Sequence, residues 1–281
     1  MSKIVFVGDT HGDHGTIGMA FKLAIEEGAT RVVSVGDWGS WPGVSGERFR
    51  DFCSNQATLT DIPLYICRGN HDWPGGLEYA KGLSWQGNHK EIAPNLFFLG
   101  RTGVWNWDDC WFAVCGGAYS IDKSRRREGI SWWPEEKIKY SDLEVLETDM
   151  AEWNLDYVDL LIAHDSPSSL PIWPGFAKDD KDSNASRHMI DNAHGIVRPN
   201  IQISGHYHRY ITWKHGQCVV HSLSCDPVAA GMWSPDLDSL AVYDTETKLV
   251  KIVNLKEVDK PKSISVSIYP HIVEVNIKEL E

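Results

Sequence analysis

The sequence predicts an α/β fold built around a parallel β-sheet, and three features of its first 70 residues support this prediction. Apolar, β-branched runs recur as KIVFV, RVVSV and PLYIC, which is typical of buried strands. The stretches between these runs carry apolar residues at helical spacing. A strand–helix–strand–helix–strand order implies neighbouring parallel strands that are joined by right-handed crossovers.

The first strand covers Lys3–Val7, and a helix is predicted over Thr16–Glu27 because Gly28 is a typical residue at a helix C-terminus. A weaker helical pattern covers Gly46–Ala57, just before the third strand. More strand-like runs follow along the chain. They are FFL near residue 97, Val104–Trp107, Cys110–Cys115, VDLLIA at 158–163 and NIQIS at 200–204.

The second half of the chain mixes helix, strands and long loops. A charged helix is predicted over Pro134–Trp153, and the short runs between Ile211 and Leu255 are typical of an antiparallel sheet. Long irregular segments are often functional, and two are expected here, at residues 116–133 and 165–185.

The C-terminal stretch KSISVSIYPHIVEVNIKEL alternates apolar and polar residues on both sides of Tyr269-Pro270. This pattern predicts a β-hairpin that adds an edge to a sheet or mediates homo-oligomer contact. We therefore expect a main domain over residues 1–258 and a hairpin extension of that domain over residues 259–281.

The composition is that of a globular protein with an acidic surface. Acidic residues number 39 against 27 basic ones in 281 residues, for a net charge of −12. Such a charge repels DNA and RNA, so long nucleic acids are not expected partners, and a DNA-processing nuclease is disfavoured. No apolar run approaches the roughly 18 residues of a membrane helix, and the chain begins with a strand in place of a signal peptide.

Six cysteines are present, and none forms a C-x-x-C pair. Zinc-knuckle spacing is therefore absent. Buried free thiols in a reducing compartment are expected instead. Together with the missing signal peptide and membrane helix, this predicts a cytoplasmic protein.

Polar side chains follow the five most clearly buried of the predicted strands. In chain order the motifs are Gly8-Asp9-Thr10-His11, Gly36-Asp37, Gly69-Asn70-His71-Asp72, His164-Asp165 and Gly205-His206-Tyr207-His208. Loops at the carboxyl ends of parallel strands converge on one crevice. We therefore expect seven metal-type side chains to meet there: Asp9, His11, Asp37, Asn70, His164, His206 and His208.

Each motif alone has an ordinary alternative, such as a turn, a helix cap or a hydrogen-bonded core histidine, but five in this order indicate a site. Carboxylate, amide and imidazole groups suit manganese, iron or zinc better than calcium. About seven ligands are too many for one tetrahedral ion and suit two, with Asp37 able to bridge them. Two divalent ions, two aspartates and a bridging hydroxide leave a charge of about +1, which attracts a phosphoester.

The combined motifs resemble those of the calcineurin-like metallophosphoesterases, and the resemblance extends from Lys3 to about Leu255. It implies a four-layer α/β/β/α sandwich and two divalent metal ions, for which manganese is favoured. It also implies in-line attack on phosphorus by a metal-bridging hydroxide. One ion would take Asp9, His11, Asp37 and His208, and the other Asp37, Asn70, His164 and His206. The segment GGAYSIDKSRRREGISWWPEEKI is similar to one in members from actinobacteria and their phages.

His71 and Asp72 are the candidate catalytic residues. His71 matches the family histidine that faces the substrate without binding metal, and it is expected to donate a proton to the leaving group. Asp72 either orients His71 or caps the next turn, and Asp165 either contacts a ligand histidine or serves a local turn. The basic cluster, Lys123 and Arg125–Arg127, is either a solvated face or a phosphate clamp.

Six tryptophans fall in predicted loops, where they either pack the loops down or offer a stacking face to a nucleobase. They are Trp38, Trp41, Trp73, Trp132, Trp133 and Trp173. These residues favour a nucleotide as the small phosphoester substrate, including cyclic nucleotides such as 2′,3′-cyclic phosphates.

A phosphodiesterase is favoured over a phosphomonoesterase because a monoester carries about two negative charges near pH 7, and no arginine follows Asp37 until Arg48. The alternatives are a phosphomonoesterase or protein phosphatase of the same superfamily, and a scaffold without activity. The protein Ser/Thr phosphatases continue the second motif with Asp-Arg and end the third in Glu. Here the second motif runs Gly36-Asp37-Trp38-Gly39-Ser40-Trp41, and the third ends in Asp72. A silent scaffold would be expected to lack ligands, and none of the seven is missing.

Overall fold

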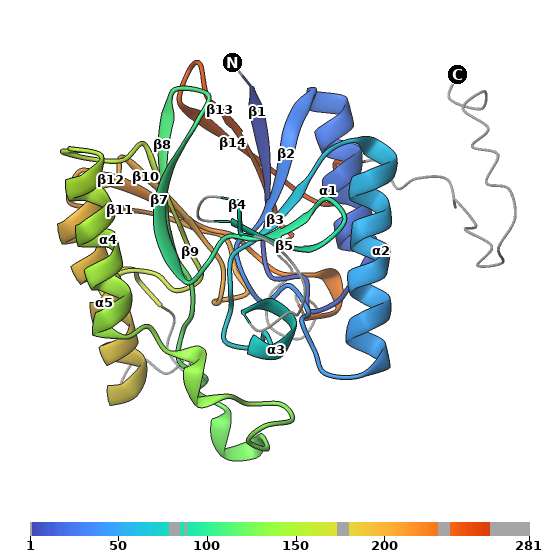
Figure 1. Cartoon of the computed structure of the whole chain (residues 1–281), viewed down its shortest axis with the longest axis horizontal. Coiled ribbons are helices and arrows are strands. Elements are labelled where there is room, and N and C mark those ends of the chain that lie inside the picture. Colours follow the sequence, from blue (N-terminus) through green and yellow to red (C-terminus); the bar gives the residue numbers. More distant parts are fainter. Residues whose placement is uncertain (1, 79–84, 87–88, 173–179, 230–236, 259–281) are drawn as a thin grey trace, which may run out of the picture.

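The computed structural model describes residues 2–258 apart from 79–84, 87–88, 173–179 and 230–236. Two β-sheets lie face to face at its centre, and helices cover the outer face of each sheet (Figure 1). The predicted four-layer α/β/β/α sandwich is therefore confirmed. The predicted C-terminal hairpin at 259–281 and its part in self-association lie outside the described residues and stay predictions.

The first sheet has eight strands among the described residues. In spatial order they are β14 (Leu249–Val253), β13 (Leu240–Asp244), β1 (Lys3–Val7), β2 (Ala29–Ser34), β3 (Leu64–Ile66), β6 (Leu96–Phe98), β5 (His89–Ala93) and β4 (Trp85–Gln86). The strands β1, β2, β3 and β6 run parallel, which confirms the predicted crossovers. On its other side β1 pairs antiparallel with β13, with Lys3 opposite Asp244.

The second sheet has six strands in the described part of the chain. They are, in spatial order, β11 (Ile211–His215), β12 (Cys218–Ser222), β10 (Ile201–Ser204), β9 (Leu160–Ala163), β8 (Cys110–Cys115) and β7 (Thr102–Trp107). The four central strands are parallel, and β7 and β11 are antiparallel edges. The antiparallel pattern expected after Ile211 holds for β11–β12 and β13–β14. On its other side β12 pairs in parallel with β10, which lies before that stretch of the chain.

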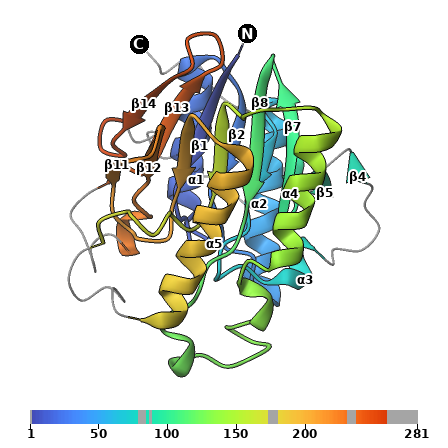
Figure 2. The same cartoon turned by 90° about the vertical axis from the view of Figure 1, so that its left-hand side faces the viewer.

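Helices α1 (His14–Glu27) and α2 (Val44–Thr60) cover the first sheet, and α4 (Tyr140–Glu152) and α5 (Lys181–Val197) cover the second (Figure 2). A single turn, α3 (Pro74–Leu77), follows the third motif. As predicted, Gly28 ends α1 in a left-handed conformation, where glycine carries no steric penalty.

Two helices differ from the sequence-based expectation. The helix predicted from Pro134 begins at Tyr140, because residues 134–136 form a separate 3-10 turn, η2 (Pro134–Glu136). Helix α5 was not predicted, and its first residues fall in a segment expected to be a loop. Its polar sequence hides a buried stripe at helical spacing, made of Met189, Ile190, Ala193 and Val197.

Alternating residues of β1 explain why the strand is apolar throughout. Ile4 and Phe6 lie in the core between the two sheets, whereas Val5 and Val7 pack beneath α1 and α2. A strand buried on both faces has no solvent-facing positions, so its sequence is a continuous apolar run. The six cysteines are free and buried, as expected. Among the described residues, no helix has the length and hydrophobicity to span a membrane.

Candidate metal centre and active site

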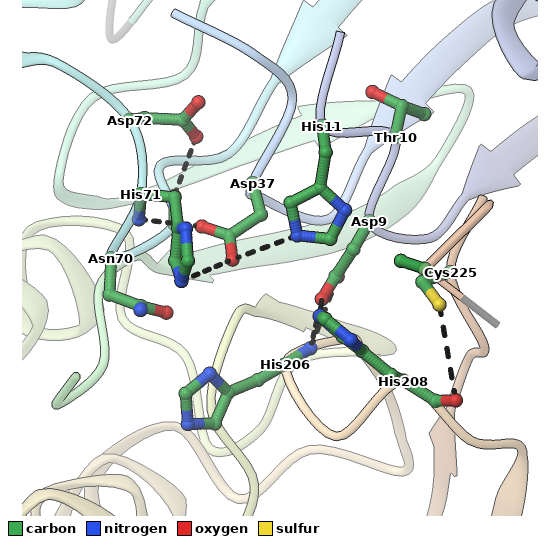
Figure 3. Close-up of polar contacts among 12 residues, drawn as sticks. Asp9, Thr10, His11, Asp37, Asn70, His71, Asp72, His206, His208 and Cys225 are labelled. Carbon is green, nitrogen blue, oxygen red and sulfur yellow. Dashed lines mark hydrogen bonds and ion pairs between the residues drawn. The ribbon is translucent and has the colours of Figure 1, made fainter. Parts of the chain in front are cut away.

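The five polar motifs lie at the carboxyl ends of β1, β2, β3, β9 and β10, where loops from both sheets meet. Figure 3 shows side chains from four of these loops turned toward one space. Residues that are far apart in sequence thus become neighbours, as the strand-end argument predicted.

One group of ligand atoms comes from Asp9, His11, Asp37 and His208, and all of these atoms lie within 4.8 Å of one another. His208 Nε2 is 3.3 Å from Asp9 Oδ2, and His11 Nε2 is 3.6 Å from Asp37 Oδ2. The two aspartates are buried. Two buried carboxylates facing imidazole nitrogens form a donor set that suits a first-row divalent ion.

A second group surrounds His164. Its Nδ1 lies 3.0 Å from the carbonyl oxygen of Val35, so it donates its proton there and leaves a lone pair on Nε2. That Nε2 is 2.9 Å from Asn70 Oδ1 and 3.4 Å from Asp37 Oδ1. The lone pair of Nε2 can therefore bind a second proton, which these two oxygens accept in the metal-free protein, or a cation that displaces that proton. The ring of His206 packs edge-on against that of His164, at 5.1 Å between centroids.

Asp37 belongs to both groups. Its Oδ2 faces His11, and its Oδ1 faces His164 and accepts the backbone N–H of His71 at 2.7 Å. Burial opposes ionisation, but His71, His164 and His11 outweigh it and hold the pKa of Asp37 well below its usual range. The donor chemistry would suit two divalent ions, and Asp37 could serve both because one of its carboxylate oxygens faces each group.

Glycines of the motifs stand where no side chain would fit. A Cβ atom on Gly205 would lie 2.0 Å from Asp9 Oδ1, and one on Gly69 would lie 2.1 Å from Asp37 Oδ1. At Gly36, where φ is +111°, a Cβ atom would lie 2.3 Å from the ring of His164. The ligands are therefore packed directly against backbone, which fixes their positions.

Four candidate ligands adopt left-handed backbone conformations that non-glycine residues rarely use. Their φ angles are 44° at His11, 47° at Asp37, 74° at His206 and 54° at His208. Each such residue costs about 1–3 kcal/mol, so the surrounding contacts must hold it. Among these contacts, His11 N donates to the Asp37 carbonyl oxygen at 2.8 Å, and His206 N donates to Asp9 Oδ2 at 2.9 Å.

The comparison with family models agrees with this geometry. The model of the calcineurin-like phosphoesterases matches residues 2–210, about three quarters of the chain. The chain belongs to this family. The family is metal-dependent, and Asp9, His11, Asp37 and His208 form a candidate metal site in this phosphoesterase.

Solved structures share the fold of this phosphoesterase at low sequence identity. TT1561 of Thermus thermophilus is 14% identical with a TM-score of 0.58, over 90% of this chain and 99% of that one. A dimetal phosphatase from Danio rerio is 11% identical with a TM-score of 0.53, over 86% and 91%. GAP50 of Plasmodium is 12% identical with a TM-score of 0.50, over 92% and 86%. No curated protein sequence gives a significant match.

Asp226 is a residue of the site that the sequence argument missed. Its Oδ2 lies 2.9 Å from His11 Nδ1, and its backbone N–H donates to the Asp9 carbonyl oxygen at 2.8 Å. Asp226 therefore orients His11, a candidate ligand of the phosphoesterase. The signal was available, because Asp226 follows β12 and β12 is parallel to β10. The expectation of an antiparallel sheet there hid the strand-end pattern.

The carboxylate of Asp72 is occupied by backbone groups of two motif loops. It accepts N–H groups of Gly39 at 3.0 Å, Ser40 at 3.1 Å and Gly69 at 2.9 Å. This geometry supports a positioning role that ties the second motif to the third, and the catalytic role of Asp72 stays a prediction. Asp165 likewise positions a loop, because it accepts the hydroxyl of Tyr207 at 2.7 Å.

Metal uptake by the phosphoesterase is expected to release protons. Burial opposes protonation of His11, but Asp226 and Asp37 outweigh it and raise its pKa to about 10. Burial also opposes protonation of His164, but Asp37 and Asp9 raise its pKa to about 9. Both imidazoles thus carry a second proton near neutral pH in the metal-free protein, and a bound metal must displace it.

We expect release of about two protons per protein at about pH 7.5, and a metal affinity that rises with pH until these pKa values are passed. Calorimetric titration with Mn²⁺ in two buffers of different ionisation enthalpy measures the release. The double variant His11→Asn, His164→Asn is the control, since asparagine does not titrate. Metal binding without buffer-dependent heat in the unsubstituted protein would contradict the prediction.

Proposed function

We propose that this calcineurin-like phosphoesterase binds two divalent metal ions, manganese being favoured, and hydrolyses small phosphodiesters, with nucleotide diesters such as cyclic nucleotides as the favoured class. The observation that carries the proposal is the position of Asp37 between two ligand groups. When bound, such a metal pair activates water and stabilises charge at phosphorus. The residues of the chain would hold the metal ions, orient the substrate and supply protons.

The charges around the site support a diester over a monoester. Arg126 lies beside His71 and pairs with Asp122 at 2.7 Å, and Asp226 lies beside His11. Two divalent ions and Arg126 would bring five positive charges. Asp122, Asp226, Asp9, Asp37 and an attacking hydroxide bring five negative ones. A pocket near neutrality, in place of the +1 expected from the sequence, gives the second negative charge of a monoester no net electrostatic stabilisation, which supports a monoanionic diester.

The positions of the loop tryptophans give partial support for a nucleotide substrate. Trp38 is 1% exposed and packs against Phe49, so it serves the core. Trp41 is half-buried and lies so close to Gly12 that a Cβ atom there would be 2.7 Å from its ring. Gly12 directly follows His11, so this indole lies near the metal ligands, where a base could stack. Trp173 lies outside the described residues.

A phosphomonoesterase or protein phosphatase is the second candidate. The contact of Arg126 with His71 favours it, because an arginine beside the metals can bind the additional negative charge of a monoester. The ion pair between Arg126 and Asp122 argues against a phosphomonoesterase, because it neutralises the charge of that arginine. A silent scaffold is disfavoured, since the chain carries all seven candidate ligands and the ligand atoms of four of them lie within 4.8 Å of one another. The cytoplasmic location and the actinobacterial or phage origin stay predictions.

Metal-stripped protein should be inactive, and Mn²⁺ should restore activity better than Mg²⁺, because Mg²⁺ prefers all-oxygen ligands. Restored enzyme should have a higher kcat/KM for bis(p-nitrophenyl) phosphate than for p-nitrophenyl phosphate, and for 2′,3′-cyclic AMP than for 3′-AMP. Full activity in protein shown by elemental analysis to be metal-free would contradict the metal requirement. A tenfold preference for the monoester of each pair would assign a phosphomonoesterase instead.

A further inference from the structure

The segment between β8 and α4, residues 116–139, belongs to none of the metal motifs, yet it reaches the site. It extends past the strand ends in both views (Figures 1 and 2). Within it, Arg126 Nη2 lies 2.7 Å from Nδ1 and 2.6 Å from Nε2 of His71. The neighbouring Arg125 and Arg127 are exposed, whereas Arg126 is 15% exposed. Of the two sequence-based alternatives, a solvated face therefore fits Arg125 and Arg127 but not Arg126.

The segment is anchored to the third motif, so the position of Arg126 is fixed. Glu136 is fully buried and accepts the hydroxyl of Ser120 at 2.6 Å and its backbone N–H at 2.9 Å. Ser120 Oγ in turn accepts Asn70 Nδ2 at 3.0 Å, which leaves Asn70 Oδ1 turned toward His164. The same segment thus orients a candidate metal ligand and presents an arginine beside it.

The guanidinium of Arg126 presents more N–H donors to the site than the imidazole of His71 has lone pairs to accept them. Its Nε donates to Asp122 at 2.7 Å, and its Nη1 donates to the Ser131 carbonyl oxygen at 3.2 Å. Among the described residues, Nη2 faces only the ring of His71, and a neutral imidazole offers one lone pair. An anionic oxygen placed between the metals and His71 would supply the missing acceptor and form charge-assisted hydrogen bonds.

We propose that Arg126 binds a non-bridging phosphoryl oxygen of the substrate, and that Asp122 sets the preference for diester over monoester by neutralising Arg126. The inference rests on the proposed function. Paired with Asp122, Arg126 contributes hydrogen bonds with little net charge, which suits a monoanion. Without that pairing, Arg126 would add a full positive charge and favour the dianionic monoester.

The test compares kcat/KM for bis(p-nitrophenyl) phosphate and p-nitrophenyl phosphate in Mn²⁺-loaded variants. Arg126→Ala should lower kcat/KM for the diester about 10–100-fold, and Arg126→Lys should recover part of it. Asp122→Asn keeps a hydrogen-bond acceptor and removes the charge, so the ratio of monoester to diester kcat/KM should rise at least about fivefold. The exposed controls, Arg125→Ala and Arg127→Ala, should match the unsubstituted enzyme.

A binding readout separates this proposal from the proposed function. Calorimetric titration of Mn²⁺-loaded protein with inorganic phosphate should give weaker binding for Arg126→Ala than for Arg125→Ala, at equal metal content and equal melting temperature. If the unsubstituted enzyme hydrolyses no ester, the proposed function fails, and phosphate binding still decides the role of Arg126. Equal rates and equal phosphate affinities in Arg126→Ala and Arg125→Ala would overturn the assignment of Arg126. An unchanged ratio of monoester to diester kcat/KM in Asp122→Asn would overturn the role proposed for Asp122.

Discussion

Substitution Asp37→Ala is expected to lower metal-dependent hydrolysis by about 10³-fold or more and to reduce the metal content at both sites. Asp37 faces both groups, since its Oδ2 points to His11 and its Oδ1 points to His164. Loss of a ligand that touches one group, as in His208→Ala or Asn70→Ala, should cost less. Elemental analysis and kcat/KM on one diester measure the two effects together.

Asp37→Asn is the matched control for the backbone role of this side chain. Asparagine can still accept the N–H of His71, which donates to Asp37 Oδ1 at 2.7 Å, but it lacks the charge that holds two cations. We expect Asp37→Asn to resemble Asp37→Ala in activity and the unsubstituted protein in metal-free melting temperature. Two retained metal ions in Asp37→Ala would contradict the bridging role.

The second large effect is expected at His71. His71→Ala should slow hydrolysis of alkyl or ribose esters by about 10²–10⁴-fold, the usual contribution of a positioned acid. Nitrophenyl esters should be slowed less, because that leaving group departs without a proton. Metal content should not change, since His71 is placed beside Asp37 without being needed as a ligand. Equal losses for both ester types would instead indicate that His71 only binds the phosphoryl group.

The pKa of His71 adds a test of its own. Burial and Arg126 lower it to about 4 against the opposing effect of Asp37, so the imidazole is neutral at pH 7 in the substrate-free protein. The negative charge of a bound phosphoester opposes the effect of Arg126 and raises the pKa of His71. Activity that depends on a protonated His71 should then fall as pH rises through this raised value. That limb should appear in kcat for ribose esters and disappear in His71→Ala.

The elements predicted well from sequence are those in which burial alone decides the structure. β1 is covered on both faces, so its sequence shows a plain apolar run. The motif loops follow such strands, and the shared geometry of parallel strand ends then brings the ligands together. Helix α5 escaped prediction because only one stripe of it is buried, and its polar residues dominate the local pattern.

The contact between Arg126 and His71 could not be predicted from the local sequence. It depends on how residues 116–139 fold, and that path is set by contacts with distant residues, such as Asn70 with Ser120 and Arg101 with the carbonyl oxygens of Glu135 and Lys137. The role of Asp72 could not be predicted for a similar reason. Its partners are backbone N–H groups, and the residue types in the sequence do not show which backbone groups a carboxylate will contact.

The spacing of the ligands along the chain has a consequence for biosynthesis. The contact between Asp9 and His206 spans 197 residues, and β1 also needs β13, which begins at Leu240. At roughly 5–20 residues per second, a ribosome takes roughly 10–40 s to make the stretch between these two ligands. A nascent chain therefore presents isolated histidines and carboxylates for most of its synthesis. The candidate metal site is complete only when the last strands join the sheets, so we expect metal loading to follow folding and not to guide its early steps.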